Sequence, residues 1–417
     1  MSTLPIGIHD LSFATTHYVL DHATLARHHD VEIGKYHHGI GQESMSVPAA
    51  DEDIVTLAAA AAAPVLDRHG TANLRTLLLA TETGVDQSKA AGLYLHSLLD
   101  LPSTMRVVEL KQACYAATAA LQLGTALIAR DPRQQVLVIA TDIAKYDLDS
   151  AAEATQGAAA VAILLSAEPA IAELDPISGI HSTDVMDFWR PNYRTTPVVD
   201  GKLSIGAYLT AAEGAWTDYR RRGGRAFDDF AAFCYHQPFT KMAYKAHHHL
   251  LKAEGRTPEP AEVDALLGAT TQYNRLIGNT YTASVYLALA SLLDHSDDLT
   301  GAPIALLSYG SGSVAEFFSA VPVSGYRDAL RTVAHHDALA ARKPVDYNHY
   351  RALHSASPPA DGGYHTTAEE TAAPYRLAAV NGHVRVYDHS GSRTRPQLAG
   401  GGGERVAALV PTDFSAE

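Results

Sequence analysis

Cysteine is scarce in this chain of 417 residues, which contains only Cys114 and Cys234. Two cysteines provide no disulfide framework, so a hydrophobic core has to hold the fold, and a chain of this length can bury one. Long apolar runs are also missing, because the longest are alanine-rich, such as 57–66, and too short to span a bilayer. The segment 1–10 lacks a basic stretch followed by an apolar one. We therefore expect a cytoplasmic protein without a membrane partner.

Positive charge is in deficit, with 32 Lys and Arg against 46 Asp and Glu and a net charge of −14. This balance argues against nucleic acid as a partner, although a few local lysines can still attract a small anion. Phosphate-binding loops, dinucleotide fingerprints and Cys-x-x-Cys motifs are absent as well. The run 247–249 consists of three histidines, but adjacent helical residues point in different directions and cannot share one metal. The sequence therefore predicts neither a metal nor a cofactor.

Short apolar runs alternate with longer stretches of Ala and Leu at helical spacing. The runs that we expect to be buried strands are 77–80, 136–140, 158–165, 231–234 and 304–307. Strands that alternate with helices predict an α/β fold with largely parallel, buried sheets.

The chain contains an internal repeat at an offset of 166 residues. The segment 114–127 (CYAATAALQLGTAL) aligns with 280–293 (TYTASVYLALASLL), and strand 135–142 aligns with 301–308. Any two Ala/Leu helices can be aligned, but the matched order of strand, helix and strand favours duplication. Two similar halves predict a site shared between them near the strand ends.

We divide the chain into an N-terminal half, 1–166, and a C-terminal half, 167–390. Residues 376–388 resemble a hairpin with Asn381-Gly382 as its turn. The Gly-rich segment 391–417 is expected to be a disordered tail.

Cys114 stands at the predicted start of an Ala-rich helix, where unpaired N–H groups can lower the pKa of a thiol and make it a nucleophile. The alternative is a buried, inert cysteine. Cys234 lies inside an apolar strand, where we expect the inert form.

Two ionisable residues end apolar strands at positions that the repeat pairs, namely Glu82 and His236. A carboxyl group in such a place can act as an acid or a base, or it can simply cap the next helix. The histidine can be catalytic or structural. Lys241 and Lys245 lie four residues apart on one helix face, which suits either phosphate binding or a solvated surface.

Taken together, the ordered segments of residues 5–390 resemble 3-hydroxy-3-methylglutaryl-CoA synthase of the bacterial mevalonate-pathway type. The segments that carry the resemblance are VEIGKYHHGIGQ (31–42), ATETGVDQSKAAG (80–92), ELKQACYAATAALQLG (109–124), VIATDIAKY (138–146), ATQGAAAVAILL (154–165), DVMDFWRP (184–191), PVVDGKLSIGAYL (197–209), YHQPFTKMAYKA (235–246), YNRLIGNTYTASVYLAL (273–289) and LSYGSGSVAEF (307–317). The resemblance implies the thiolase fold, a duplicated five-layer α/β/α/β/α arrangement, and a homodimer.

The resemblance also implies a Claisen condensation of acetyl-CoA with acetoacetyl-CoA, which are substrates and not cofactors. Cys114 would hold the acetyl group as a thioester, Glu82 would remove a methyl proton, and His236 would bind and polarise the acetoacetyl group. The backbone N–H groups of Cys114 and Ser311 would stabilise the enolate oxygen. Water would then release the product.

Other positions carry over from the resemblance as binding residues. They are Glu32, Thr155, Asp187, Ser204, Lys241, Lys245, Asn279 and Ser311, with Asp142 and Asp200 in matching acidic segments. Some family members have Asp where this chain has Glu32, and Asp187 is expected to support the pocket.

Three rival readings remain open at this point. A relative that performs β-branching in polyketide assembly uses the same Cys, Glu and His but takes acyl groups from an acyl carrier protein. A cysteine hydrolase would use His236 as the base for Cys114, which leaves Glu82 unexplained. A non-catalytic binding protein would not need all three residues.

Overall fold

The computed structural model describes residues 4–257 and 259–389. The predicted tail 391–417 lies outside the described residues. The strands are β1 (Gly7–Thr15), β2 (Tyr18–Asp21), β3 (Ser44–Val47), β4 (Leu74–Ala80), β5 (Arg106–Leu110), β6 (Gln135–Ile143), β7 (Ala158–Ser166), β8 (Ala172–Leu174), β9 (Gly179–Ser182), β10 (Phe188–Trp189), β11 (Val198–Val199), β12 (Ala232–Tyr235), β13 (Ile304–Gly310), β14 (Val314–Pro322), β15 (Lys343–Pro344), β16 (Tyr364–Thr366), β17 (Tyr375–Asn381) and β18 (Val384–His389).

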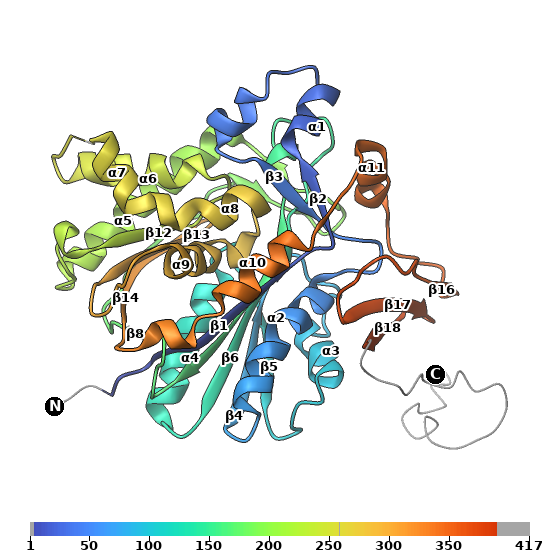
Figure 1. Ribbon diagram of the computed structural model, residues 1–417, viewed down its shortest axis with the longest axis horizontal. Helices are drawn as coiled ribbons and strands as arrows, with labels where there is room; N and C mark the ends of the chain where they lie inside the picture. Colours follow the sequence, from blue (N-terminus) through green and yellow to red (C-terminus); the bar gives the residue numbers. More distant parts are fainter. Residues whose placement is uncertain (1–3, 258, 390–417) are drawn as a thin grey trace, which may run out of the picture.

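Helices connect and cover these strands (Figure 1). They are α1 (His22–His28), α2 (Ile54–His69), α3 (Ala91–Leu98), α4 (Ala116–Arg130), α5 (Gly201–Arg221), α6 (Lys241–Ala253), α7 (Pro260–Leu267), α8 (Gln272–Ile277), α9 (Ser284–His295), α10 (Thr332–Ala340) and α11 (Tyr347–Ser355), with a π-helix η1 (Lys35–Ile40) and a 3-10 helix η2 (Glu153–Thr155). None of the helices in the described part of the chain is both long and apolar enough to cross a membrane.

The main sheet shows the duplication directly. Its strand order is β12-β13-β14-β8-β1-β7-β6-β4-β5, so the run β4-β6-β7-β1 is repeated as β12-β13-β14-β8 on the other side. The two runs meet where β1 and β8 pair antiparallel. All five predicted strands and the repeat are confirmed, and α4 and α9 occupy equivalent places in the two halves.

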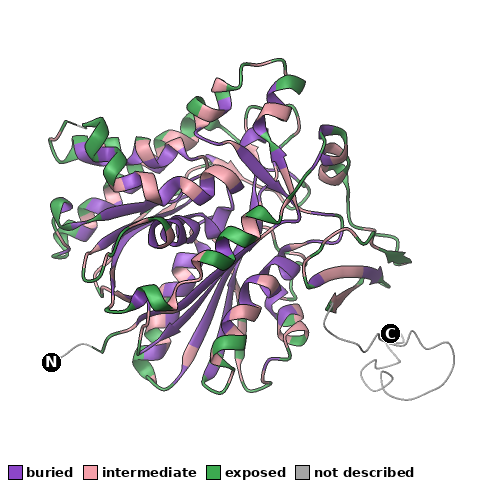
Figure 2. Ribbon diagram, viewed as in Figure 1, coloured by how far each residue is buried: buried purple, intermediate pink, exposed green. Residues whose placement is uncertain are grey.

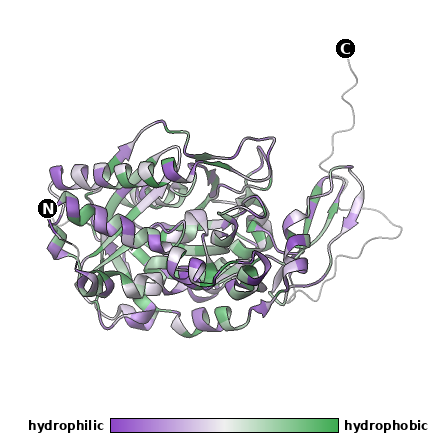
Figure 3. Ribbon diagram, turned by 90° about the horizontal axis from the view of Figure 1, so that it is seen from above, coloured by the Kyte–Doolittle hydropathy of each residue, from purple (hydrophilic) through white to green (hydrophobic). Residues whose placement is uncertain are grey.

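Both faces of each half-sheet are buried, which gives the five layers. Along β7, alternate residues from Ala159 to Leu165 contact the core that contains α4 and α9, and the intervening ones from Ala158 to Leu164 contact the core under α2 and α3. The C-terminal half-sheet likewise faces the α4–α9 core on one side, and α5, α6 and α7 on the other. Figure 2 shows the buried strands at the centre, and Figure 3 shows peripheral helices with hydrophilic and hydrophobic stripes. The fold is therefore thiolase-like.

The expectation of largely parallel sheets is wrong. Parallel pairing links β4 to β5 and β6, and β12 to β13, whereas the other pairs of the main sheet are antiparallel. The reason is connection length, because only residues 311–313 join β13 to β14, and a parallel pair needs a long crossover.

A small C-terminal sheet of β16, β17 and β18 stands at one end of the molecule (Figure 1). The predicted hairpin is present, but its turn lies one residue later than expected. Asn381 pairs with Val384, and the two residues between them, Gly382 and His383, have φ values of 54° and 69°. Two positive φ angles are typical of a type I′ turn, which matches the twist of the strands.

The end of β13 approaches the loop before α4 so closely that a methyl group does not fit. A Cβ added at Gly310 would lie 2.5 Å from the carbonyl oxygen of Gln112 and 2.6 Å from the nitrogen of Tyr115. We therefore expect Gly310→Ala to lower the free energy of unfolding by about 1–3 kcal/mol in urea denaturation. Gly206→Ala is the matched control, because a methyl group there meets nothing within 4 Å. A Gly310→Ala variant as stable as the control would contradict the close approach.

Candidate active site

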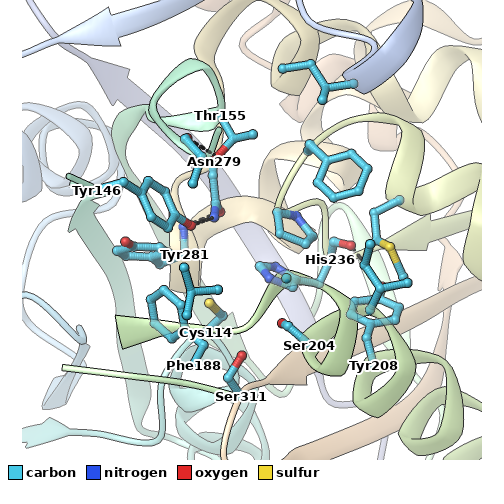
Figure 4. A pocket seen from close by; sticks show the side chains of 18 of the residues that line it. Cys114, Tyr146, Thr155, Phe188, Ser204, Tyr208, His236, Asn279, Tyr281 and Ser311 are labelled. Atoms are coloured by element: carbon cyan, nitrogen blue, oxygen red, sulfur yellow. Dashed lines mark hydrogen bonds between the residues drawn. The ribbon is translucent and has the colours of Figure 1, made fainter. Parts of the chain in front are cut away.

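A cavity of about 400 Å³ lies where the two halves meet. Figure 4 shows Cys114, His236, Asn279 and Ser311 around the same space. Of the predicted site residues, Cys114, Thr155, Ser204, His236, Asn279 and Ser311 line the cavity. The N-terminal half supplies Cys114 and Thr155, and the C-terminal half supplies the others, so the site is shared as the repeat predicted.

The side chains of Cys114 and Glu82 are directly paired. The thiol donates a hydrogen bond of 2.9 Å to Glu82 Oε1. Cys114 precedes α4 by two residues, as predicted, and Ala113 before it has a φ of +43°, in the left-handed region. Such a conformation is costly for a residue with a side chain and is typical of functional turns. Because the thiol bonds a carboxyl group and not an imidazole, the geometry does not support the hydrolase reading.

The expected lowering of the Cys114 pKa is wrong. Burial, and then the neighbouring Glu82, raise the pKa of the thiol well above its usual value. Burial, followed by the charge of Asp142, also raises the pKa of Glu82 to about 8. Desolvation and the acidic neighbour thus raise the pKa of the Cys114 thiol by more than the helix N-terminus lowers it. The raised pKa keeps the thiol protonated, and Glu82 is in position to accept its proton.

Asp142, at the end of β6, fixes the position of Glu82. Its Oδ1 accepts hydrogen bonds from the backbone N–H of Glu82 at 2.9 Å and from the hydroxyl groups of Thr81 and Thr83, both at 2.7 Å. Its Oδ2 accepts from the backbone N–H of Thr282, in the other half, at 3.0 Å. One buried carboxylate therefore ties the loop of the base to the C-terminal half.

His236 follows β12 directly and is 3% exposed. Burial lowers its pKa to about 3, so the ring is neutral near pH 7. Within the described residues, its Nδ1 has no hydrogen-bond partner. A neutral imidazole with an unsatisfied nitrogen next to a cavity is suited to hydrogen bonding with a ligand.

Asn279 is held by a small network across the two halves. Its Oδ1 accepts from the backbone N–H of Tyr281 at 2.9 Å, and its Nδ2 donates to the hydroxyl of Tyr146 at 3.3 Å. Its own backbone N–H donates to the carbonyl of Thr155. Ser311 lies in the turn between β13 and β14, where its carbonyl accepts from Gln112 Nε2 at 3.2 Å.

The aromatic walls of the cavity were not expected from the sequence, although they lie in the segments that carry the family resemblance. These walls are Tyr146, Phe188, Tyr208, Phe239, Tyr281 and Tyr309. The signal available was Tyr281, which the repeat paired with Tyr115 but which we read only as a mark of duplication.

Asp187 is completely buried and does not line the cavity. It accepts hydrogen bonds from the hydroxyl of Tyr309 at 2.8 Å and from the backbone N–H of Gly312 at 2.9 Å. It therefore supports the wall that presents Ser311, through Tyr309 and Gly312. Asp200 accepts from two backbone N–H groups at the start of α5 and caps that helix.

Besides Asp187, three predicted binding residues lie outside the cavity lining, namely Glu32, Lys241 and Lys245. Glu32 is exposed in the segment between α1 and η1. The two lysines begin α6, and Lys245 Nζ lies 5.1 Å from the ring centre of Phe239, which does line the cavity. Lys245 is thus beside the cavity, and Lys241 lies one turn before it on the same helix.

The three consecutive histidines diverge, as expected. Nδ1 of His247 contacts the Tyr235 hydroxyl at 2.9 Å, and Nε2 of His249 contacts Glu213 at 2.7 Å. In the described part of the chain, one group has metal-ligand geometry, formed by His29, Asp149 and Glu153. Its carboxylates already accept hydrogen bonds from Arg351 and Tyr350 of α11. These bonds attach the loop that lines one side of the cavity to α11.

Known proteins match this chain in sequence over most of its length. The model of the hydroxymethylglutaryl-coenzyme A synthase N terminal domain matches residues 4–170, and that of the C terminal domain matches 173–261 and 261–353. A hydroxymethylglutaryl-CoA synthase from Enterococcus faecalis is 39% identical over 92% of this chain and 100% of that protein. The polyketide biosynthesis 3-hydroxy-3-methylglutaryl-ACP synthase PksG from Bacillus subtilis (strain 168) is 30% identical over 83% of this chain and 86% of its own length.

Solved structures give the same result. A crystal structure of HMG-CoA synthase complexed with CoA superimposes with a TM-score of 0.88 at 37% identity, covering 92% of this chain and 100% of that one. MvaS in complex with 3-hydroxy-3-methylglutaryl coenzyme A gives 0.84 at 35% identity, over 92% and 99%. Fold and comparisons define an enzyme of the thiolase-like class. Within that class, the chain belongs to the hydroxymethylglutaryl-CoA synthase family.

The raised pKa of Cys114 can be tested by alkylation. In a Cys234→Ser background, we expect the pH midpoint of Cys114 alkylation by iodoacetamide to lie above that of a free thiol, measured by intact mass. Glu82→Gln should lower this midpoint, because it removes the negative charge that opposes the thiolate. A midpoint that does not move in Glu82→Gln would separate the two residues electrostatically and contradict the pairing.

Proposed function

We propose that the protein condenses acetyl-CoA with acetoacetyl-CoA and water to give 3-hydroxy-3-methylglutaryl-CoA and CoA, in the mevalonate route to isoprenoids. The observation that carries the proposal is the Cys114–Glu82 hydrogen bond at a cavity whose other wall presents His236 and Asn279. A covalent acetyl-enzyme divides one difficult encounter of two thioesters into two easier steps.

In the first step, Cys114 attacks the acetyl thioester while Glu82 accepts the thiol proton. That proton goes to the departing CoA sulfur. The catalytic role of Cys114 is supported by its position before α4 and its place in the cavity lining.

In the second step, Glu82 removes a proton from the acetyl methyl group. The backbone N–H groups of Cys114 and Ser311 are proposed to stabilise the enolate oxygen, since both residues line the same cavity. The carbanion attacks the C3 ketone of acetoacetyl-CoA, which His236 and Asn279 would bind. Glu82 returns its proton to the new alkoxide, and water then hydrolyses the Cys114 thioester.

The arms of the CoA substrates would leave the cavity past Thr155, Ser204 and the start of α6. Lys241 and Lys245 there are suited to the phosphates, and Glu32 remains a more distant candidate. Asp187 acts only by supporting the wall. We propose no metal or cofactor, because acid–base and nucleophilic groups already account for each step.

We further propose a homodimer in the cytoplasm. Large apolar side chains that are exposed in the single chain, such as Met186 at 57% and Tyr193 at 88%, support an interface between copies. The cytoplasm is the compartment in which charged CoA thioesters would meet the enzyme without crossing a membrane.

Intact mass after brief incubation with acetyl-CoA tests the chemistry. We expect one acetyl group on Cys114, and its loss as 3-hydroxy-3-methylglutaryl-CoA forms upon addition of acetoacetyl-CoA. Cys114→Ala should not be acetylated. Glu82→Gln should still accept some acetyl group but condense at least about 10²-fold more slowly, because general acid–base catalysis supplies 10²–10⁴-fold. Normal condensation by Glu82→Gln would refute its role, and Cys234→Ser should retain most activity.

The source of the acyl group distinguishes the proposal from its alternative, a synthase that acts on acyl carrier proteins in polyketide β-branching. We expect free acetyl-CoA to acetylate Cys114 in the parent, and Lys241→Glu to weaken this reaction through a higher KM, because a charge near the phosphates is reversed. Initial rates at varied acetyl-CoA provide the measurement. An adduct formed only from an acetylated carrier protein would establish the alternative.

A further inference from the structure

One face of α11 binds the loop that forms a wall of the cavity. The side chains that make these bonds are Tyr347, Tyr350, Arg351 and His354, which are three or four residues apart and therefore lie on one side of the helix. Their partners in the loop lie between residues 146 and 156. The same loop contributes residues from 146 to 155 to the cavity lining. A helix that lies outside the cavity thus holds one of its walls.

His354 and Tyr350 fix the backbone of Tyr146. Nε2 of His354 donates to the carbonyl oxygen of Tyr146 at 2.8 Å and to Gln156 Oε1 at 3.1 Å. The backbone N–H of Tyr146 donates to the same Oε1 at 2.7 Å, and Gln156 Nε2 donates to the hydroxyl of Tyr350 at 2.7 Å. Burial lowers the pKa of His354 to about 4, so the ring is neutral near pH 7 and carries its proton on the nitrogen that meets two acceptors.

The side chain of Tyr146 lies beside the cysteine. Cys114, Tyr146 and Tyr281 belong to one buried cluster, against which Phe188 packs. The centre of the Tyr146 ring is 6.1 Å from that of Phe188 and 6.3 Å from that of Tyr281, both edge to face. Figure 4 shows these three rings on one side of Cys114. An acyl group on the sulfur would meet this aromatic wall, so the position of the wall limits how long that group can be.

The wall is not closely packed from behind. A smaller cavity of about 70 Å³ lies between the loop and α11, with Ala144, Gln156, Tyr350 and His354 in its lining. Protein interiors contain few spaces of this size, and side chains that border one lack packing partners on that side. The position of Tyr146 therefore depends on the hydrogen bonds to its backbone, and the wall has room to retreat when they are lost.

We propose that His354, together with Tyr350, positions the Tyr146 wall and thereby restricts the acyl group that Cys114 accepts to acetyl. The role is a positioning one, because neither side chain lines the larger cavity. This inference rests on the proposed function. In its first step the bond from the acyl carbon to the CoA sulfur breaks as the bond to Cys114 Sγ forms, and the thiol proton passes through Glu82 to the departing CoA sulfur. A propionyl group would undergo the same step but needs a wall that is farther from the sulfur.

Competition between two acyl donors tests the inference. The protein is mixed with equal amounts of acetyl-CoA and propionyl-CoA, and the ratio of the two adducts on Cys114 is measured by rapid-quench intact mass. One extra methylene in a hydrophobic pocket changes a rate by about 10–200-fold, so we expect the parent to favour acetyl by a factor in this range and His354→Leu to lower that factor about tenfold. Both adducts form in the same sample, so a fraction of unfolded protein does not alter their ratio.

Three further variants show which property of His354 matters. His354→Gln should keep the parental ratio, because the amide nitrogen of Gln can donate to the same two oxygens. Tyr350→Phe should lower the preference for acetyl, because Gln156 Nε2 loses its acceptor. Asn348→Ala is the matched control on the exposed side of α11 and should have the parental ratio.

The outcomes separate this inference from the proposed function. If the parent forms neither adduct, the proposed function is wrong. If the parent is acetylated but His354→Leu and Tyr350→Phe keep its ratio, the wall is not positioned from α11 and the inference is overturned. A His354→Gln variant with the ratio of His354→Leu would also overturn it, because the hydrogen bonds would then not determine the position of the wall.

Discussion

The carboxylate of Asp142 is the fixed point on which the catalytic arrangement depends. It is completely buried at the end of β6, and it receives N–H and O–H donors from the Glu82 loop on one side and from Thr282 on the other. Its charge also contributes to the raised pKa of Glu82. Asp142 does not line the cavity, but it fixes the position of Glu82 and contributes to the raised pKa of that carboxyl group.

The second consequence of this buried acid concerns the nucleophile. A thiol beside a carboxyl group that is itself hard to ionise stays protonated, so the protein does not keep a reactive thiolate exposed to oxidants. In the reaction that we propose, the thiol gives up its proton to Glu82 only when a substrate occupies the cavity.

Much of the fold was predictable because its signals are local. Apolar runs such as 136–140 identify buried strands, and the repeat from Cys114 onward identifies two equivalent halves. Cys114, Glu82 and His236 could be singled out from the sequence because of where they stand. Glu82 and His236 follow the ends of strands, and Cys114 precedes the start of a helix. The antiparallel pairing was missed because it depends on how the strands are connected in space, as where only residues 311–313 join β13 to β14. The raised pKa of Cys114 was missed because it arises first from burial and then from Glu82, which is 32 residues away along the chain and in contact only after folding.

The pairing of β1 with β8 places a local twofold axis through the middle of the chain. By the repeat offset of 166 residues, Cys114 corresponds to Thr280 in the other half, and Glu82 corresponds to His236 because each follows the matching strand, β4 or β12. An ancestor with identical halves would have carried the same residues on both sides of the boundary between the halves. Duplication within one chain removes that symmetry, since each half can change without altering the other. In the present chain the matched positions differ, with Glu82 and Cys114 in one half and His236 and Thr280 in the other, so a single cavity receives two different sets of side chains.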